Sequence, residues 1–490
     1  MKKLLLALAL ACVSVLSSAQ EVHLPDFGSS AGGLLSPEEE ERIGRDMMRQ
    51  LRGYNYLLDD PQTSEYIESL GYRLVANSDR PEQEFTFFVV KSEELNAFAA
   101  PGGYIGVYTG LITTAEAESE LAAVLSHEVA HVTQRHLVRA FENIRNASLP
   151  IALAMIGAII AAQGAGGGDA AQAAVVGGTA LMQQQQINFT RHNEYEADRI
   201  GIGTLAKTEY DPYAMATFFG RMGRAMRGNG DQVPEFLRTH PVTTTRITEA
   251  KNRADAMAGR VTTGQHTPED FLRFRERARV LGADRANELV SFYEKNETLP
   301  ADVREYGLCL ALIYSNRAND AVPRLVQLVG KYPGEVAYVL ALAQAESVSG
   351  RRKNARERLA ALWRERPDNR AVAIAYADEL IASGEKDQAR TAVAALRPLM
   401  PTNANDPRMQ LSFARACELA GDEIRAGEAH AEVALLNGRA MDAMTLLETL
   451  LKREDIDYYQ RSRIEARIAQ ITPWVLELRR KSIEPGQEDA

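Results

Sequence analysis

A 34-residue spacing in the second half of this 490-residue chain constrains its fold more than any other feature. An alanine, a proline, and an Asn or Gly five residues before each alanine all recur at this spacing. These residues are Ala321, Ala355 and Ala389; Pro333, Pro367 and Pro401; and Asn316, Gly350 and Gly384. Small alanines let paired helices approach closely, Asn or Gly permits the left-handed turn between them, and Pro ends the second helix. The spacing therefore predicts stacked helix pairs.

This period is that of tetratricopeptide repeats, which stack into an α-solenoid with a concave surface for partner segments. Two later pairs keep the five-residue spacing, Gly421 with Ala426 and Gly438 with Ala443. We expect the array to span roughly Phe271 to Lys481 and assign it the domain 263–490. Such a domain recruits a substrate or an assembly machine; the alternative is a helical cap without partners.

The first half of the chain contains the sequence His127-Glu128-Val129-Ala130-His131. Two imidazoles four residues apart project from one face of a helix, with a carboxylate between them. Neutral imidazole nitrogens suit Zn²⁺, which in catalytic sites takes three protein ligands and leaves the fourth position to water. The pattern predicts His127 and His131 as zinc ligands and Glu128 as the catalytic base. A surface helix with scattered polar residues is the alternative.

The helix that carries this motif is expected to run without interruption from about Thr114 to Phe141. Thr113 and Glu116 have the spacing of a capping box, and a buried stripe is predicted at Leu121, Leu125, Val129 and Val132. His136 lies nine residues after His127. In a continuous helix this places it about 180° away, so we expect it to point away from the zinc and to be structural.

A second acidic motif lies downstream, from Asn193 to Arg199. Glu194 and Asp198 are four residues apart, so they share one face of a helix. One of the two can bind zinc while the other supports it. Asp198 is the candidate for accepting the distal N–H of a ligand histidine, which fixes the tautomer of that ring. The alternative is an acidic, solvated helix face.

Taken together, the His-Glu-x-x-His helix and the later Glu-x-x-Ala-Asp sequence resemble the zinc metallopeptidases that include the CaaX prenyl endopeptidases and HtpX-type proteases. This resemblance implies a zincin-type endopeptidase domain, placed at 20–262, with one Zn²⁺ per chain. It also implies that Glu194 is the third ligand. The expected fold class is therefore mainly α with a small β-sheet, followed by an α-solenoid of tetratricopeptide repeats.

The sequence Asn96 to Gly103 resembles the substrate-binding edge strand of this family. Phe85 to Lys91 and Ile105 to Tyr108 are rich in β-branched and aromatic residues, and a Pro-Gly-Gly turn lies between them. An unpaired edge binds an extended peptide through its main chain, with little dependence on sequence. The substrate-binding residues are expected to be Asn96, Ala97 and Phe98. Asn96 as a simple turn residue is the alternative.

The sequence Thr239-His240-Pro241, with Arg246 after it, resembles a late His-Pro…Arg motif of the same family. The resemblance implies that His240 and Arg246 belong to the catalytic machinery. His240 either donates to the developing oxyanion or occupies the open position of zinc as a latent fourth ligand. Arg246 orients either group. Without the resemblance, the sequence would predict only that His240 is a loop residue and that Arg246 is a surface arginine.

The N-terminus predicts export. Lys2 and Lys3 precede an apolar stretch from Leu4 to Leu16, and small residues before Gln20 predict a signal peptide, 1–19, that is cleaved after Ala19. A lipoprotein modified at Cys12 is the less favoured alternative. After cleavage two cysteines remain, Cys309 and Cys417, and the sequence leaves open whether they form a disulfide bond.

An insertion at 149–186 lies between the zinc-binding helix and Glu194. Apolar runs within Leu149 to Met182 flank the glycine-rich segment Gly164 to Gly168, and neither run reaches the roughly 20 residues that a membrane span needs. We interpret the insertion as a glycine-hinged lid over the cleft. Peripheral membrane contact through 149–182 and a buried helical hairpin are the alternatives.

The net charge of −10, without a basic block, excludes nucleic acid as a partner. A narrower resemblance is to the periplasmic members of the metallopeptidase family in Gram-negative bacteria. It is carried by His23-Leu24-Pro25-Asp26, the string from His127 to His136, Glu196 to Gly201, and the repeats. It implies cleavage of unfolded or misassembled proteins, and repeats that bind the outer-membrane β-barrel assembly machinery. The alternative is chiefly a chaperone or scaffold with a latent zinc centre.

Overall fold

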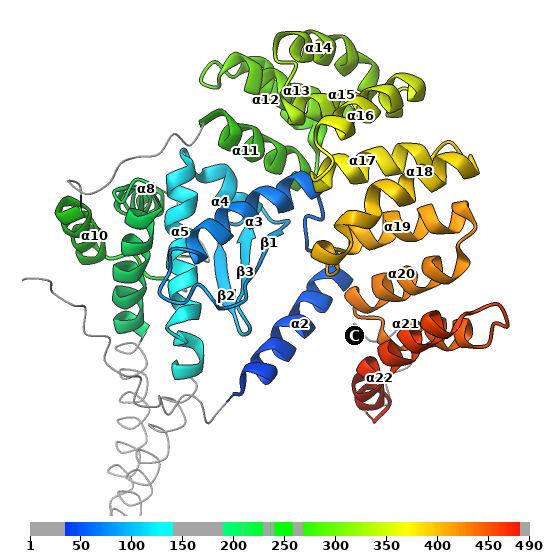
Figure 1. The fold of residues 1–490 in the computed structure, drawn as a ribbon. Helices are drawn as coiled ribbons and strands as arrows, with labels where there is room; N and C mark the ends of the chain where they lie inside the picture. Colours follow the sequence, from blue (N-terminus) through cyan, green and yellow to red (C-terminus); the bar gives the residue numbers. More distant parts are fainter. Residues whose placement is uncertain are drawn as a thin grey trace, which may run out of the picture.

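The computed structural model describes residues 35–140, 190–208, 210–228, 236, 240–257 and 268–480. The expected signal peptide, Cys12, the segment from His23 to Asp26 and the insertion at 149–186 lie outside these residues. The described chain is mainly helical, with one three-stranded sheet in its first half and stacked helix pairs in its second (Figure 1). The predicted fold class is confirmed. None of the helices in the described ranges is long and apolar enough to cross a membrane.

The sheet consists of β1 (Thr86–Val90), β2 (Ala97–Ala100) and β3 (Tyr104–Tyr108), in the order β1-β3-β2. β3 is parallel to β1 and antiparallel to β2. The predicted turn between β2 and β3 has positive φ at both Gly102 and Gly103. A Cβ on Gly103 would lie 2.2 Å from the Glu84 carbonyl oxygen, so only glycine fits there.

Helices cover both faces of the sheet. α3 (Pro61–Val75) and α5 (Glu118–Thr133) pack against one face, where they bury a common apolar core with β1, β2 and β3. α2 (Pro37–Gly53) packs against the opposite face through Met48 and the rings of Phe88 and Tyr104. A Cβ on Gly44 of α2 would lie 2.2 Å from the Tyr104 ring, so this glycine allows the close approach.

The predicted continuous helix from Thr114 to Phe141 is wrong at both ends. α4 (Thr109–Thr114) ends before the motif, and α5 starts after Ala117, which makes no side-chain cap. The predicted capping box of Thr113 and Glu116 is absent, because the Glu120 carboxylate accepts the Glu116 N–H instead, at 2.7 Å. α5 ends at Thr133, and a separate short helix occupies 136–140.

Three more helices belong to the first half: a helix at 190–207, α8 (Ala214–Gly228) and α10 (Thr244–Met257). The helix at 190–207 carries the second acidic motif, and α10 carries Arg246. α8 packs against both α5 and α10. In this way α8 joins the element that carries the zinc-binding motif to the element that carries Arg246.

The second half is an array of antiparallel helix pairs (Figure 1). Its helices are α11 (Pro268–Gly282), α12 (Ala286–Lys295), α13 (Ala301–Tyr314), α14 (Ala318–Lys331), α15 (Val336–Val348), α16 (Arg352–Glu365), α17 (Arg370–Ile381), α18 (Lys386–Leu396), α19 (Pro407–Ala420), α20 (Glu423–Leu436), α21 (Ala440–Leu451) and α22 (Tyr458–Arg480). Asn316, Gly350 and Gly384 have positive φ at the turns, as the 34-residue spacing predicts. Cys309 and Cys417 are buried free thiols.

The array curves along one side of the first half and contacts it at both of its ends (Figure 1). At one end α11 packs on α3 and α4, and its Phe271 and Phe274 belong to the apolar core beneath the sheet. At the other end α2 meets the last repeats. The Arg52 guanidinium donates to the Leu436 carbonyl at 3.1 Å, and that of Arg49 lies 3.6 Å from the Trp474 ring centroid.

An ion pair between a buried arginine and a largely buried aspartate fixes the first of these contacts. Asp60 caps the N-terminus of α3 and accepts two hydrogen bonds from Arg277 of α11, at 2.6 and 2.8 Å. Burial alone would raise the pKa of Asp60, but the charge and hydrogen bonds of Arg277 hold that pKa below its usual value. A carboxylate of this kind stabilises the fold above its unfolded pKa, and the contribution is lost as pH falls through its folded pKa.

We expect Asp60→Asn to lower the free energy of unfolding by about 3–5 kcal/mol at neutral pH, because it leaves the Arg277 charge buried and unpaired. Asparagine keeps the helix cap, so the loss reports the ion pair. The urea midpoint measures the effect, and the difference from wild type should shrink below about pH 4. Asp387→Asn, in an exposed pair with Arg390, is the control. Equal losses in the two variants would contradict the prediction.

Candidate metal centre

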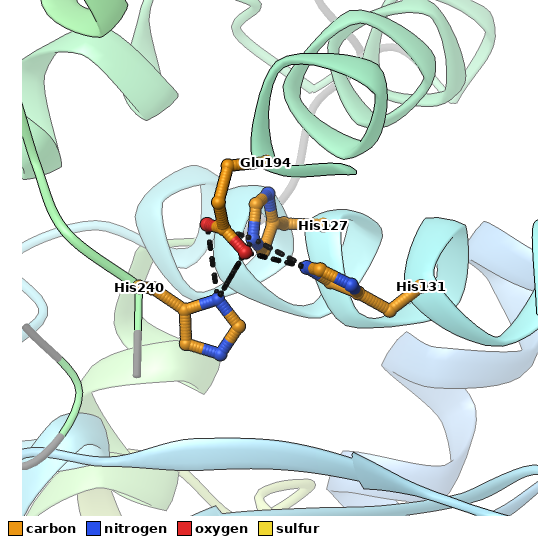
Figure 2. A group of neighbouring side chains, drawn as sticks. All are labelled: His127, His131, Glu194 and His240. Atoms are coloured by element: carbon orange, nitrogen blue, oxygen red, sulfur yellow. Dashed lines mark hydrogen bonds and ion pairs between the residues drawn. The ribbon is translucent and has the colours of Figure 1, made fainter. Parts of the chain in front are cut away.

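Four side chains from three parts of the chain converge on one buried point (Figure 2). His127 and His131 come from α5, Glu194 from the helix at 190–207, and His240 from the segment before α10. One ligand atom from each lies within 4.8 Å of all the others. The structure thus brings together the two predicted histidine ligands, the implied third ligand and the implied fourth.

The spacing of these atoms fits a tetrahedral ion. Nε2 of His127 lies 3.0 Å from Nε2 of His131 and 3.4 Å from Oε2 of Glu194, and Nε2 of His131 lies 3.4 Å from Oε1 of Glu194. Zinc ligands at about 2.0–2.1 Å in a tetrahedron are separated by about 3.3–3.4 Å. Zinc also prefers the ligand types present here, which are three imidazoles and one carboxylate. The residues present therefore fit zinc.

Asp198 and Arg246 hold two of these ligands from behind. Oδ1 of Asp198 lies 2.9 Å from Nδ1 of His127, the ring nitrogen that faces away from the cluster. The Arg246 guanidinium donates to both Asp198 oxygens, at 2.7 and 2.8 Å, and lies 2.9 Å from Oε2 of Glu194. Its Nη1 also donates to the Pro241 carbonyl, next to His240. Arg246 thus connects the carboxylates to the segment that carries His240.

The electrostatics of the pocket favour a cation. Burial lowers the pKa of His127, but hydrogen bonds and charges from Asp198 and Glu194 outweigh it and raise that pKa to about 10. Burial lowers the pKa of His131 to about 3, so this ring is neutral and its nitrogen is free to bind a metal. The pKa of Glu194 is held well below its usual value, since the histidines around it outweigh its burial.

Glu128 stands beside the cluster without joining it. Its side chain is buried, burial raises its pKa, and no hydrogen-bond partner within the described part of the chain reaches its Oε1. Nε2 of His240 lies 3.7 Å from this oxygen. A buried acceptor without a partner is costly, so a water molecule or a substrate group is its natural partner here.

A cleft with a volume of about 340 Å³ leads to Glu128 and His131. β2 and the following turn, Ala97 to Gly102, form one wall, and Asn96 lies at its start. Asn96 is buried, and its Oδ1 has no hydrogen-bond partner among the described residues. Phe98 also lines the cleft, and its ring packs edge-on against the rings of Phe88 and Tyr108 in the sheet. All three residues implied to bind substrate line the cleft.

The expectation that His136 points away from the site is wrong. Nδ1 of His136 lies 2.9 Å from Nδ1 of His131, and its Nε2 lies 3.1 Å from Oε2 of Glu196. The expectation assumed a continuous helix, but the chain turns at Gln134 and Arg135, where Arg135 has a φ of 53°. Neither residue is Gly or Pro, so nothing local in the sequence signals the turn.

Comparisons with known proteins agree with this geometry. Residues 61–254 match the model of peptidase family M48, and residues 349–416 match a tetratricopeptide repeat model. The chain belongs to peptidase family M48, whose members are zinc metalloendopeptidases.

Among its relatives, the chain is similar to a putative beta-barrel assembly-enhancing protease of Vibrio cholerae, with 35% identity over 69% of this chain and 70% of the relative. It is 34% identical to the beta-barrel assembly-enhancing protease of Escherichia coli, over 64% of each chain. A mitochondrial metalloendopeptidase of Schizosaccharomyces pombe is 29% identical over 44% of this chain and 60% of the relative. The alignments with the two bacterial proteases thus span about two thirds of their length.

We expect Arg246→Lys to weaken zinc binding about 10- to 100-fold, because a lysine cannot hold both oxygens of Asp198 and also reach Glu194. Competition with a chromophoric chelator measures the affinity. Arg253→Lys, on the same helix and paired with Glu249, is the matched control and should bind zinc like the wild type. An unchanged affinity in Arg246→Lys would show that the arginine does not support the ligands.

Proposed function

We propose that the protein is an exported zinc metalloendopeptidase that hydrolyses misfolded or stalled proteins during outer-membrane protein assembly. The observation that carries the proposal is the four-donor cluster with the unpartnered Glu128 carboxylate beside it. The names of the bacterial relatives support the role in β-barrel assembly. One zinc ion per chain, a signal peptide cleaved after Ala19 and a periplasmic location belong to the same proposal.

The chemistry follows from the positions of the side chains. His127, His131 and Glu194 would hold the zinc ion, which would supply Lewis-acid polarisation of the scissile carbonyl. Glu128 takes the proton of the attacking water and passes it to the leaving amine. The burial of Glu128 suits this task, because it raises the pKa of this carboxyl group toward the pH at which the enzyme works. Asp198 and Arg246 keep the ligands in place throughout.

We expect Glu128→Gln to keep its zinc and to cleave casein about 10²- to 10⁴-fold more slowly, since an amide cannot accept the proton. Zinc content and cleavage rate are measured on the same samples. Glu116→Gln, an exposed glutamate just before α5, is the control and should retain activity. If the wild type holds zinc and cleaves no faster than Glu128→Gln, the catalytic proposal fails. Absence of zinc from the wild type would refute the metal site.

The edge of β2 that pairs with no other strand in the described part of the chain is the proposed binding site for the substrate main chain. The Tyr108 N–H donates to the Asn96 carbonyl at 3.0 Å, so Asn96, Phe98 and Ala100 occupy the positions that hydrogen-bond to β3. The backbone groups of Ala97 and Ala99 therefore point to the opposite edge, toward the cleft. A peptide that pairs there gains affinity from main-chain hydrogen bonds. Such pairing suits an enzyme that accepts many unfolded sequences.

We expect Ala99→Pro to raise KM for a peptide substrate about tenfold, because it removes one N–H from the free edge, a hydrogen bond of about 1–1.5 kcal/mol. The pairing of β2 with β3 should survive, since proline is tolerated on the open side of an edge strand. Initial rates over a range of substrate concentrations measure the effect. Ala99→Ser keeps the N–H and serves as the control. An unchanged KM in Ala99→Pro would place the substrate elsewhere.

A second candidate function is a chaperone or scaffold with a latent zinc centre. Nδ1 of His240 lies 3.1 Å from both Glu194 oxygens and 3.3 Å from Nε2 of His127. This nitrogen therefore occupies the position of a fourth ligand. Catalytic zinc sites keep that position open. The buried ring of Phe236 stacks on His240, with centroids 4.8 Å apart, and holds it in place. We propose that His240 closes the site until a substrate or partner displaces it.

We expect His240→Ala to raise casein cleavage about 10- to 100-fold, because it removes a ground-state contact of about 1.5–3 kcal/mol from the open position. The cleavage rate per bound zinc is the readout. His430→Ala, a half-exposed histidine on α20, is the control. A lower rate would instead assign His240 to stabilising the developing oxyanion.

A further inference from the structure

Both imidazoles of α5 that enter the metal centre have a second ring nitrogen that faces away from the cluster. For His127 this nitrogen is Nδ1, which lies 2.9 Å from Asp198. For His131 it is also Nδ1, and its partner is another histidine, His136, at 2.9 Å. Ligand histidines usually donate this N–H to a carboxylate, a carbonyl or water, because the bond fixes both ring orientation and tautomer. In His131 a neighbouring imidazole takes that place.

The turn after α5 is what brings His136 to this position. Thr133 ends the helix, and Arg135 follows with a left-handed φ of 53°. The Arg135 side chain forms an ion pair with Glu40 of α2 and donates to the Leu35 carbonyl at 3.2 Å. These contacts hold the left-handed backbone conformation, which is unfavourable for a residue other than glycine. His136 is buried as a result, with its ring edge-on to that of His131.

Glu196 determines the tautomer of His136. Its Oε2 lies 3.1 Å from Nε2 of His136 and 3.0 Å from Nη1 of Arg139. An ionised carboxylate only accepts hydrogen bonds, so Nε2 of His136 carries the proton. Nδ1 of a neutral His136 is then an acceptor, and the facing Nδ1 of His131 must be the donor. Nε2 of His131 is left without a proton, and this is the nitrogen that points into the cluster.

We propose that Glu196 and His136 are positioning residues that fix the metal-binding tautomer and orientation of His131. This proposal rests on the zinc site proposed above. It gives the three acidic residues of the second motif separate tasks: Glu194 is a ligand, Asp198 supports His127, and Glu196 supports His131 through His136. Removal of such a supporting partner typically weakens metal binding about 10- to 100-fold.

The experiment compares the zinc affinities of His136→Phe, His136→Asn and Glu196→Gln, by competition with a chromophoric chelator at fixed pH. Phenylalanine fills the space of the imidazole but cannot accept the His131 N–H. Asparagine places a carbonyl oxygen where Nδ1 stood, so it restores the acceptor. We expect His136→Phe to weaken binding about 10- to 100-fold and His136→Asn to recover most of that loss. Glu196→Gln should fall between them. His430→Phe is the control.

Wild-type affinity in His136→Phe, with zinc still bound, would overturn the proposal and leave the proposed enzyme intact. Equal losses in His136→Phe and His136→Asn would also overturn it, because the hydrogen-bond acceptor would then be irrelevant. If the wild type itself binds no zinc, the metal site and this proposal fail together. These outcomes separate the two proposals.

A second measurement does not depend on how the variants fold. Nitrogen-15 NMR of the imidazoles in the zinc-loaded wild type identifies the protonated nitrogen of each ring. We expect a proton on Nε2 of His136 and on Nδ1 of His131. A proton on Nδ1 of His136 would overturn the proposal, because two donors would then face each other across 2.9 Å.

Discussion

The buried guanidinium of Arg246 is the interaction on which the metal centre depends. Asp198 and Glu194 are both buried carboxylates, and placing them side by side in a low-dielectric interior is costly unless a cation is present. Arg246 makes a bidentate pair with the first and a close contact with the second. Its own pKa is raised, because hydrogen bonds and charges from these carboxylates outweigh the effect of its burial. The helix at 190–207 can therefore turn an acidic face inward.

The rest of the first half supports this arrangement. α5 has few polar positions that are open to solvent, and it buries both faces, one against the sheet and one against α8. The sheet itself is small, yet its edge strand supplies a wall of the cleft. α5 also packs on β2, and the two elements share one apolar core. This core therefore fixes the distance from His127 and His131 to the proposed substrate-binding edge of β2.

Much of this organisation is predictable from the sequence, for physical reasons. The repeats follow from side-chain size and turn residues at a fixed period, and the strands follow from runs of β-branched and aromatic residues around a glycine turn. The donors His127 and His131 follow from helical spacing. The turn at Arg135 is not predictable in this way, because its left-handed conformation is held by Glu40, which lies 95 residues away in the sequence. His136 and Glu196 were missed for the same reason. The packing of Phe271, on the first helix of the array, into the core under the sheet is likewise not predictable from the repeat spacing, because it depends on contacts with the first half of the chain.

α2 has a mechanical consequence for the molecule. It is about 25 Å long, and it is capped at its start by a reciprocal Ser36 and Glu39 box. Its first turns contact Arg135 and line the cleft through Glu40, while its last turns contact Leu436 and Trp474 of the final repeats. A helix of this length bends little, so it acts as a rod between the cleft and the repeats. A change in curvature of the repeat stack must either break these contacts or tilt the rod and shift the cleft wall.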